Sequence, residues 1–354
     1  MMIKLPGLID PHVHLREPGG THKEDWDTGT QAALAGGFTM VLTMPNTQPP
    51  VVDAPSMDTC AALAEQKARC DYGIFLGASQ TPLPLDELSR LSKSAAGLKV
   101  YMNHTFGPLK VEDMSLWMHY FAGAPREMPI AAHAEGHTLA AVILMAQLYN
   151  RPAHLCHVSR RDEILLIRKA KEQGIPITCE VAPHHLFLSE EDLPRIGQAR
   201  GQVRPDLNTA VDRQALWDNL DVIDCFATDH APHTLAEKDG PKTPPGFPGL
   251  ETALPLLLTA VADDRLTLDQ LIERCHTNPR RIYHLPEQPD TWVEADPDAR
   301  WELNAASTFT RCGWTPFEGM PVQGKITRVV LRGKPVYQDG RILAEPGYGK
   351  NIKL

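Results

Sequence analysis

Eight short apolar runs, each followed by a longer helical or loop segment, constrain the fold of this chain more than any other feature. The runs predict strands at residues 7–13, 38–44, 72–78, 97–102, 129–134, 153–158, 177–182 and 222–228. Helical patterns lie between them, as at 54–69, 138–149 and 162–173. Apolar strands that alternate with helices are typical of a parallel sheet buried on both faces. The alternation therefore predicts an α/β fold.

Two architectures share this alternation, a closed (β/α)8 barrel of the TIM type and an open doubly wound sheet. Polar or reactive residues end nearly every predicted strand, namely His12, His14, Asn46, Lys99, Asn103, His133, His157, Glu180, His184 and Asp229. A barrel gathers such residues around the carboxyl rim of its strands. An open sheet would concentrate them at one switch point. The even distribution favours the barrel.

The pattern changes after residue 240 of the chain. A Pro/Gly-rich loop at 241–249 cannot be helical. Further segments follow, with helical patterns at 250–262 and 267–276 and short β patterns at 324–331, 334–336 and 341–344. Because only residues 1–5 precede the first motif, a side sheet would come mainly from 324–344. We expect the barrel over residues 6–300 and a small C-terminal β extension over residues 301–354, packed on it.

Composition excludes several classes of protein. Side chains that are 42% hydrophobic and 22% charged are typical of a globular protein with a sizeable core. The net charge of −9 and the lack of a Lys/Arg cluster argue against nucleic-acid binding. No apolar run reaches the roughly 20 residues of a membrane span, and the N-terminus lacks a signal-peptide pattern. Seven scattered cysteines without a C-x-x-C pair favour a reducing, cytoplasmic setting.

The tripeptide His12-Val13-His14 lies at the end of the first predicted strand. Alternate residues of a strand point to the same face, about 6–7 Å apart along the chain. Both imidazoles can therefore reach one metal ion. Two histidines that are hydrogen-bonded at a strand end, without a metal, are the alternative.

Further metal ligands end other predicted strands, namely His133, His157 and Asp229. Imidazole and carboxylate groups are the ligands of zinc-like ions in hydrolytic sites. Two ions about 3.5–4 Å apart would use these ligands better than one crowded ion, and would hold a hydroxide between them. The pattern therefore favours a binuclear centre.

A binuclear centre needs a bridging anionic ligand, and the strand at 97–101, which contains Lys99, offers no anionic oxygen. A lysine that is desolvated beside cations is driven to its neutral form. A neutral amine can add carbon dioxide, and the resulting carbamate supplies two oxygen atoms. A lysine that binds substrate or pairs with a carboxylate is the alternative.

An ordered set of motifs runs along the chain. It comprises HVHLREPG at 12–19, MPNT at 44–47, GLK at 97–99, HAE at 133–135, CHVS at 156–159, EVAPHH at 180–185, TDHAPH at 228–233, PPGFPGLET at 244–252 and WTPFEG at 314–319. The set resembles the dihydroorotases of the amidohydrolase superfamily and covers essentially the whole chain. Most closely it resembles the dihydroorotase domain of the multifunctional pyrimidine-synthesis polypeptide that also carries carbamoyl-phosphate synthetase and aspartate transcarbamoylase.

The resemblance implies a role for each predicted metal ligand. His12 and His14 would hold one zinc ion (Zn²⁺), and His133 and His157 a second. Carboxylated Lys99 would bridge the two ions. The resemblance also implies that Asp229 contacts the first ion and transfers protons.

A third zinc ion is implied near Cys156 and Glu180. A thiolate beside a carboxylate can bind zinc, which gives a count of two or three ions per chain. Because buried cysteines and strand glutamates are commonly structural, a purely structural role of both residues is the alternative.

The substrate's carboxylate needs a cationic partner, and Arg16 shares a face with His14. A guanidinium binds a carboxylate through two parallel hydrogen bonds. The resemblance implies that Arg16, Asn46 and His233 bind the α-carboxylate of dihydroorotate. The alternatives are a surface ion pair for Arg16, with Glu17 or Glu24, and a capping role for His233.

The resemblance implies further substrate contacts, at Thr105, Phe106, Arg204 and Pro245. Thr105 and Phe106 belong to the polar–aromatic segment 103–108, which suits a mobile lid that excludes water. An ordinary connection between a strand and a helix is the alternative for this segment.

These implications predict a dihydroorotase, which reversibly cyclises N-carbamoyl-L-aspartate to L-dihydroorotate in pyrimidine biosynthesis. A zinc-activated hydroxide would attack the cyclic amide, and Asp229 would serve as general acid and base. The resemblance also implies a homodimer and an association or fusion with aspartate transcarbamoylase. Two alternatives stay open, a hydantoinase or allantoinase and a metal-free scaffold.

Overall fold

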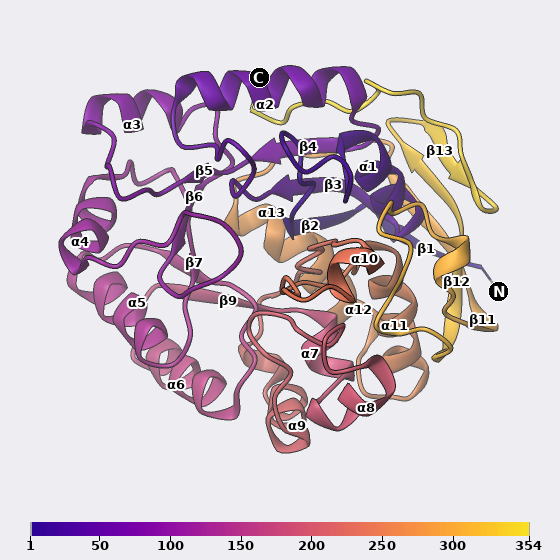
Figure 1. Cartoon of the computed structure of the whole chain (residues 1–354). Coiled ribbons are helices and arrows are strands. Elements are labelled where there is room, and N and C mark those ends of the chain that lie inside the picture. Colours follow the sequence, from indigo (N-terminus) through magenta and orange to yellow (C-terminus); the bar gives the residue numbers. More distant parts are fainter. Residues whose placement is uncertain (1, 354) are drawn as a thin grey trace.

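A closed parallel barrel forms the centre of the computed structural model, which describes residues 2–353 (Figure 1). Its strands are β2 (Leu8–Val13), β3 (Phe38–Thr43), β4 (Asp71–Ile74), β5 (Leu76–Gly77), β6 (Leu98–Tyr101), β7 (Ile130–His133), β8 (Ala153–Leu155), β9 (Ile177–Val181) and β10 (Cys225–Phe226). They form two parallel sheets, β2-β3-β4 and β5-β6-β7-β8-β9-β10. Only Phe75 separates β4 from β5, and a parallel bridge between Val13 and His230 joins the end of β2 to the segment that follows β10. The predicted (β/α)8 barrel is confirmed.

Most of the helices lie around the barrel, whereas the short α10 (Leu235–Lys238) lies inside this ring in the view of Figure 1. In chain order the helices are α1 (Trp26–Ala35), α2 (Ala54–Lys67), α3 (Leu85–Leu91), α4 (Met114–Gly123), α5 (His137–Leu148), α6 (Arg161–Glu172), α7 (Pro183–Phe187), α8 (Leu193–Ile196), α9 (Ala210–Asp218), α10, α11 (Leu250–Ala262), α12 (Leu268–Ile272) and α13 (Asn278–Ile282). Asp25 and Asp53 begin α1 and α2 as N-caps, each accepting a backbone N–H of the first turn. The helix predicted at 267–276 is shorter than expected, because a π-helical turn at Glu273–Thr277 follows α12.

An antiparallel sheet lies beside the barrel and combines a strand from near the N-terminus with strands from the C-terminal part of the chain (Figure 1). Its strand order is β1 (Ile3–Pro6), β11 (Trp292–Glu302), β12 (Pro321–Leu331), β13 (Lys334–Gln338) and β14 (Arg341–Ile342). The expectation that this sheet comes mainly from residues 324–344 is too narrow. β11 was missed because its acidic and basic residues hide the alternation of apolar and polar residues that indicates a strand. In the structure its pairing with β12 is irregular between Asp296 and Arg300.

The predicted boundary at residues 300 and 301 falls inside β11, which belongs to the sheet along its whole length. We therefore propose to place the boundary before Trp292 and to count β1 with the extension. No helix within residues 2–353 combines the length and the apolar composition needed to span a membrane.

Candidate active site

The strand ends bring the predicted metal ligands together at one rim of the barrel. His12, Lys99, His133 and His157 are each at most 2% exposed, and Asp229 is 5% exposed. A small pocket at this rim is lined by His12, His14, Arg16, Asn46, Thr105, Phe106, His133, His157, Arg204, Asp229 and Pro245. Tyr101, Ala231 and Gly246 also line it and were not predicted.

His12 and His14 point their Nε2 atoms at the same carboxylate. His12 Nδ1 lies 2.5 Å from Glu180 Oε1, and His14 Nδ1 lies 2.6 Å from Asn46 Oδ1. Because both oxygens are acceptors, each Nδ1 carries the proton and each Nε2 is left with a lone pair. These lone pairs face Asp229 Oδ1 at 3.3 and 3.1 Å. Three acceptors that converge in this way fit a cation between them.

The protonation of His14 agrees with this arrangement. Burial lowers the pKa of His14 to about 4, which outweighs the opposing effect of Asp229. The imidazole is therefore neutral at neutral pH, which is the form that binds a metal ion.

His133 and His157 form a second pair of imidazoles. His133 Nδ1 lies 2.8 Å from His157 Nε2, and the opposite nitrogen of His157 has no hydrogen-bond partner within residues 2–353. Burial lowers the pKa of both side chains, so both are neutral. Two neutral imidazoles whose nitrogens face each other fit a second ion.

Lys99 lies beside the first group of ligands. Its Nζ is 3.4 Å from His12 Nε2 and donates to Cys156 Sγ at 2.9 Å. The side chain is fully buried, and no carboxylate in the described part of the chain lies within ion-pair distance of it. The alternative of a lysine paired with a carboxylate is therefore not supported.

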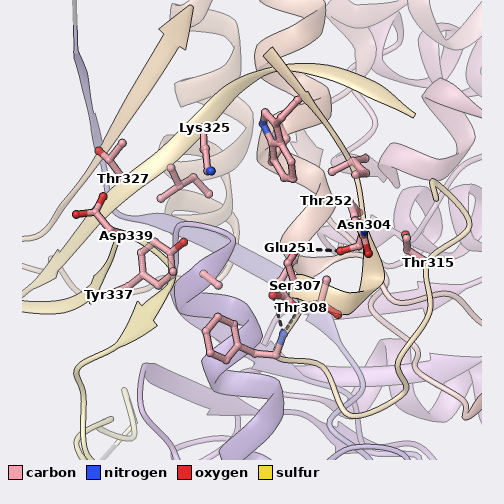
Figure 2. Close-up of a pocket in the computed structure, with 17 residues that line it drawn as sticks. Glu251, Thr252, Asn304, Ser307, Thr308, Thr315, Lys325, Thr327, Tyr337 and Asp339 are labelled. Carbon is pink, nitrogen blue, oxygen red and sulfur yellow. Dashed lines mark hydrogen bonds between the residues drawn. The ribbon is translucent and has the colours of Figure 1, made fainter. Parts of the chain in front are cut away.

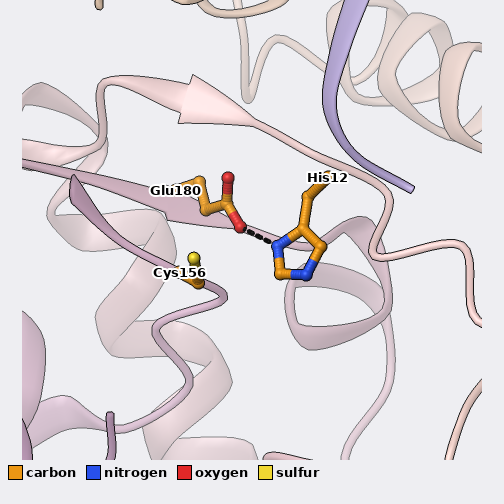
Figure 3. A group of neighbouring side chains, drawn as sticks. All are labelled: His12, Cys156 and Glu180. Atoms are coloured by element: carbon orange, nitrogen blue, oxygen red, sulfur yellow. Dashed lines mark hydrogen bonds and ion pairs between the residues drawn. The ribbon is translucent and has the colours of Figure 1, made fainter. Parts of the chain in front are cut away.

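Glu180 lies between two histidines next to Cys156. Figure 3 shows its carboxylate bonded to His12, with the Cys156 sulfur nearby. Ligand atoms of His12, Cys156 and Glu180 all lie within 4.8 Å of one another. The other Glu180 oxygen is 3.1 Å from His154 Nε2. Sequence reasoning missed His154, because an isolated histidine in a strand carries no motif signal.

Three candidate residues have backbone conformations that side chains rarely adopt. The φ angles are 61° for Arg16, 35° for His157 and 46° for Asp229. Neighbouring bonds hold the Asp229 segment in place, since Thr228 Oγ1 donates to Asp10 at 2.5 Å and His14 N donates to His230 O at 2.8 Å. Such outliers cluster at functional sites. Asp10, which is buried and has a pKa raised to about 7 by burial, was also missed.

The predicted carboxylate-binding residues lie together beside the histidines. Arg16 Nε donates to Pro232 O at 3.1 Å, and its Nη2 lies 3.0 Å from His233 Nε2. Burial lowers the pKa of Arg16 to about 10, so the guanidinium stays charged at neutral pH. Glu17 instead pairs with Lys67 at 2.5 Å. The alternative of a surface ion pair for Arg16 is therefore not supported.

The predicted lid segment reaches over this cluster. Asn46 Nδ2 donates to Phe106 O at 3.1 Å. The Phe106 ring centre lies 5.0 Å from that of His233 and 5.3 Å from the Arg16 guanidinium carbon. Arg204 also lines the pocket, where it pairs with Asp206. These contacts place the residues that are predicted to bind substrate around the small pocket at the strand ends.

A larger cavity lies elsewhere, between α11 and the antiparallel sheet (Figure 2). Its volume is about 390 Å³, and its walls include Trp301, Phe309 and Tyr337. Glu251 lies at its side and accepts N–H groups from Phe309 at 2.9 Å and Thr310 at 3.1 Å. Burial raises the pKa of Glu251 to about 8. We name this space the sheet cavity, and the pocket at the strand ends the rim pocket.

A barrel whose rim carries converging histidines and a carboxylate is the architecture of a metal-dependent hydrolase. Residues 3–288 match the amidohydrolase family, and the chain belongs to this family. The family resemblance of the motifs is confirmed.

Sequence similarity to two curated relatives extends over nearly the whole chain. The chain is 57% identical to the multifunctional protein CAD of Squalus acanthias over 352 residues, which are 99% of this chain and 16% of that protein. It is 34% identical to the dihydroorotase of Pyrococcus furiosus over 365 residues, 99% of this chain and 85% of that protein. The chain thus spans about a sixth of the multifunctional relative.

Two solved structures share the fold. An L-hydantoinase from Arthrobacter aurescens superimposes with a TM-score of 0.93 at 24% identity, covering 99% of this chain and 88% of that one. An inactive dihydroorotase-like domain of a CAD-like multifunctional protein from Chaetomium thermophilum gives a TM-score of 0.85 at 29% identity, covering 99% of both chains.

Proposed function

We propose that this chain is a dihydroorotase, which interconverts N-carbamoyl-L-aspartate and L-dihydroorotate in pyrimidine biosynthesis. The names of two relatives support this activity, because one is a dihydroorotase and the other carries this region within a multifunctional protein. The observation that carries the proposal is the position of Arg16, Asn46 and His233 beside the metal ligands. A charged, buried guanidinium at that point selects a substrate with a carboxylate.

We propose that two zinc ions bind at the rim pocket, one between His12, His14 and Asp229 and one at His133 and His157. The converging lone pairs fit this role. Carboxylated Lys99 would supply the shared ligand, since the buried amine has no carboxylate partner among the described residues. When bound, the ions polarise an amide carbonyl and lower the pKa of water.

The chain's own residues orient the reactants and move the proton. In the hydrolytic direction, a carbon–oxygen bond forms at the amide carbonyl and the ring carbon–nitrogen bond breaks. Asp229 accepts the proton of the attacking water and delivers it to the departing nitrogen. In the reverse direction Asp229 takes the proton from the ureido nitrogen and gives it to the departing hydroxide.

Substrate binding divides between two groups of residues. Arg16, Asn46 and His233 hold the α-carboxylate, and Arg204 and Pro245 face the pyrimidine ring. The lid residues Thr105 and Phe106 then exclude water from the rim pocket. Every one of these residues except His233 lines the rim pocket, and His233 contacts Arg16.

The third ion is a separate proposal. We propose that Cys156 and Glu180 hold it, because their ligand atoms lie close to His12. In fully carboxylated protein, Cys156→Ser should lower the zinc count from three to two per chain, measured by elemental analysis. A count of two in both proteins would contradict this site and leave the binuclear centre in place.

Two other functions are less well supported. A hydantoinase acts on uncharged ureides and has no use for the Arg16 guanidinium. A metal-free scaffold finds a precedent in the inactive domain from Chaetomium thermophilum. Against a scaffold, the predicted ligands are all present in the chain. Five of them line the rim pocket, and Lys99 Nζ lies 3.4 Å from His12 Nε2; the five are His12, His14, His133, His157 and Asp229.

Assembly is a further part of the proposal. Helices α4 and α5 carry no Asp, Glu, Lys or Arg, and expose Met114, Met118, Leu144 and Leu148 by 43–67%. An uncharged apolar face is compatible with a second copy of a chain that carries a net charge of −9. We propose that this face forms a homodimer. Association or fusion with aspartate transcarbamoylase, and a cytoplasmic setting, stay predictions.

A substrate panel tests the proposed activity. Purified, zinc-loaded protein is mixed with dihydroorotate, hydantoin and allantoin, and ring opening is followed by ultraviolet absorbance. We expect turnover of dihydroorotate alone, and none of it in Asp229→Ala. Opening only of an uncharged ureide would support a hydantoinase. No turnover of any substrate despite bound zinc would support the scaffold.

A further inference from the structure

Lys23 is a buried lysine in the loop between β2 and α1 that none of the motif-based roles includes. Its side chain is 8% exposed, and its Nζ lies 3.0 Å from Glu237 Oε1. The same Nζ lies 3.2 Å from His233 Nδ1 and 4.5 Å from the centre of the Phe106 ring. Lys23 therefore contacts both a carboxylate-binding residue and the lid.

His233 has a cation at each of its two ring nitrogens. Arg16 Nη2 lies 3.0 Å from Nε2, and Lys23 Nζ lies 3.2 Å from Nδ1. Burial and these neighbouring cations hold the pKa of His233 far below its ordinary value, so the ring is neutral. A neutral imidazole has one acceptor nitrogen, whereas arginine and lysine side chains only donate. The ring can therefore satisfy only one of the two cations.

An anion resolves this mismatch. The loop that holds Pro245 lies beside the His233 ring, and His233 Nδ1 lies 3.7 Å from Glu237 Oε2. Gly246, at φ 142°, allows this loop to pack close to His233. A carboxylate beside Arg16 and His233 would accept the hydrogen bonds that the imidazole cannot. Within residues 2–353, Glu237 is the only carboxylate in ion-pair distance of Lys23 or Arg16, so the two cations retain an excess of positive charge.

The same lysine also contacts the lid. The Phe106 ring lies within cation–π distance of Lys23 at 4.5 Å and of Arg16 at 5.3 Å. The Phe106 carbonyl is held by Asn46, which bonds His14 through its other amide atom. Closure of the lid is thereby connected to the cations that would hold the substrate's carboxylate.

We propose that Lys23 is a positioning residue of the carboxylate subsite, which orients His233, adds the second positive charge and holds the Phe106 lid closed. It thereby sets the preference for substrates that carry a ring carboxylate over uncharged analogues. This inference rests on the proposed function, because Lys23 would act through His233 and Phe106, two residues of the proposed substrate site.

The test compares a carboxylate ligand with its uncharged counterpart. Calorimetry of the zinc-loaded full chain gives the dissociation constants of orotate and of orotate methyl ester. In Lys23→Met we expect the preference for orotate to fall at least about tenfold, the size of one lost charge-assisted contact. The KM for dihydroorotate should rise more than kcat falls, while zinc content stays unchanged. Lys23→Arg should restore most of the preference.

Two controls make the result decisive. Lys169→Met changes an exposed lysine, which is 73% accessible and paired with Glu172. It should leave the dissociation constants of both ligands unchanged. If Lys23→Met does not fold, Lys23→Gln removes the same charge and should lower the preference equally. A preference within twofold of wild type would overturn the role of Lys23. Wild-type protein that neither binds orotate nor opens dihydroorotate would instead overturn the proposed function.

Discussion

The rim pocket and the sheet cavity differ in size and in the kinds of side chain that line them. The rim pocket has a volume of about 20 Å³, whereas the sheet cavity has about 390 Å³. Histidines and a carboxylate from several strand ends line the rim pocket, whereas the sheet cavity is lined mainly by hydroxyl-bearing, aromatic and aliphatic side chains and contains no histidine among the described residues. Convergence of polar groups, and not volume, therefore identifies the candidate active site.

The two spaces also differ in how their buried polar groups are satisfied. In the sheet cavity, the Glu251 carboxyl accepts N–H groups from Phe309 and Thr310, so it is already paired. At the rim, the ring nitrogens of His133 and His157 face each other at 2.8 Å, and no carboxylate of the described residues lies within ion-pair distance of Lys99. A buried polar group without a hydrogen-bond partner lowers the stability of the folded state. The rim pocket therefore fits a site completed by metal ions and substrate.

The largest expected effect is that of Lys99→Ala. Loss of the proposed bridging ligand should reduce zinc below two ions per chain and lower kcat at least about a thousandfold. Elemental analysis and the dihydroorotate assay measure both. Lys325→Ala, which changes a lysine of the sheet cavity, is the matched control and should keep full activity. If Lys99→Ala and Lys325→Ala lost zinc and kcat to the same extent, the rim pocket would not differ from the sheet cavity in function.

Arg16→Met should have the next largest effect. It removes the buried cation of the carboxylate subsite, so kcat/KM for dihydroorotate should fall about a hundredfold while zinc stays bound. Steady-state kinetics and elemental analysis test this together. Arg300→Met, on the exposed part of β11, should change neither value. Unchanged kcat/KM in Arg16→Met would contradict the assignment of the subsite.

A smaller effect is expected for Phe106→Ala. Removal of the lid ring should lower kcat about tenfold without loss of zinc, because water enters the rim pocket. Phe309→Ala makes the same change in the sheet cavity and should lower the thermal unfolding midpoint without affecting kcat. Full activity of Phe106→Ala would show that segment 103–108 is an ordinary connection.

The last prediction concerns the pH dependence of stability and leaves the activity unchanged. Glu251 has its pKa raised to about 8 by burial, so the folded state holds a proton that the unfolded state has released above about pH 4.3. The free energy of unfolding should therefore decrease between about pH 5 and 8, by at most about 1.4 kcal/mol per pH unit for this group. Glu251→Gln should flatten the decrease in denaturant titrations. An identical slope in both proteins would contradict the assignment.

Local sequence patterns predicted the barrel well but not the side sheet. The apolar runs located β2, β3 and β6 within about two residues, because each is buried over its whole length. β11 escaped notice because only Val293 and Ala295 are buried and its other residues include many charges, which hide the apolar alternation of a strand. β1 is a four-residue strand whose pairing partner lies nearly 300 residues away. A pairing between strands so far apart in the sequence cannot be predicted from a short stretch of residues.

The site shows the same division between local motifs and long-range contacts. Residues within recognisable motifs, such as His12, Arg16 and Asp229, were predicted from the sequence and lie together in the structure. Their supporting partners were missed. Asp10 bonds Thr228 across 218 positions, and Lys23 contacts His233 across 210. Only the folded chain shows these contacts.

A crystal structure of the zinc-loaded protein soaked with dihydroorotate tests the central claim most directly. We predict ligand density in the rim pocket, with its carboxylate against Arg16, Asn46 and His233 and its amide beside the metal ions. Ligand density in the sheet cavity beside Glu251, with zinc but no ligand at the rim, would contradict the account.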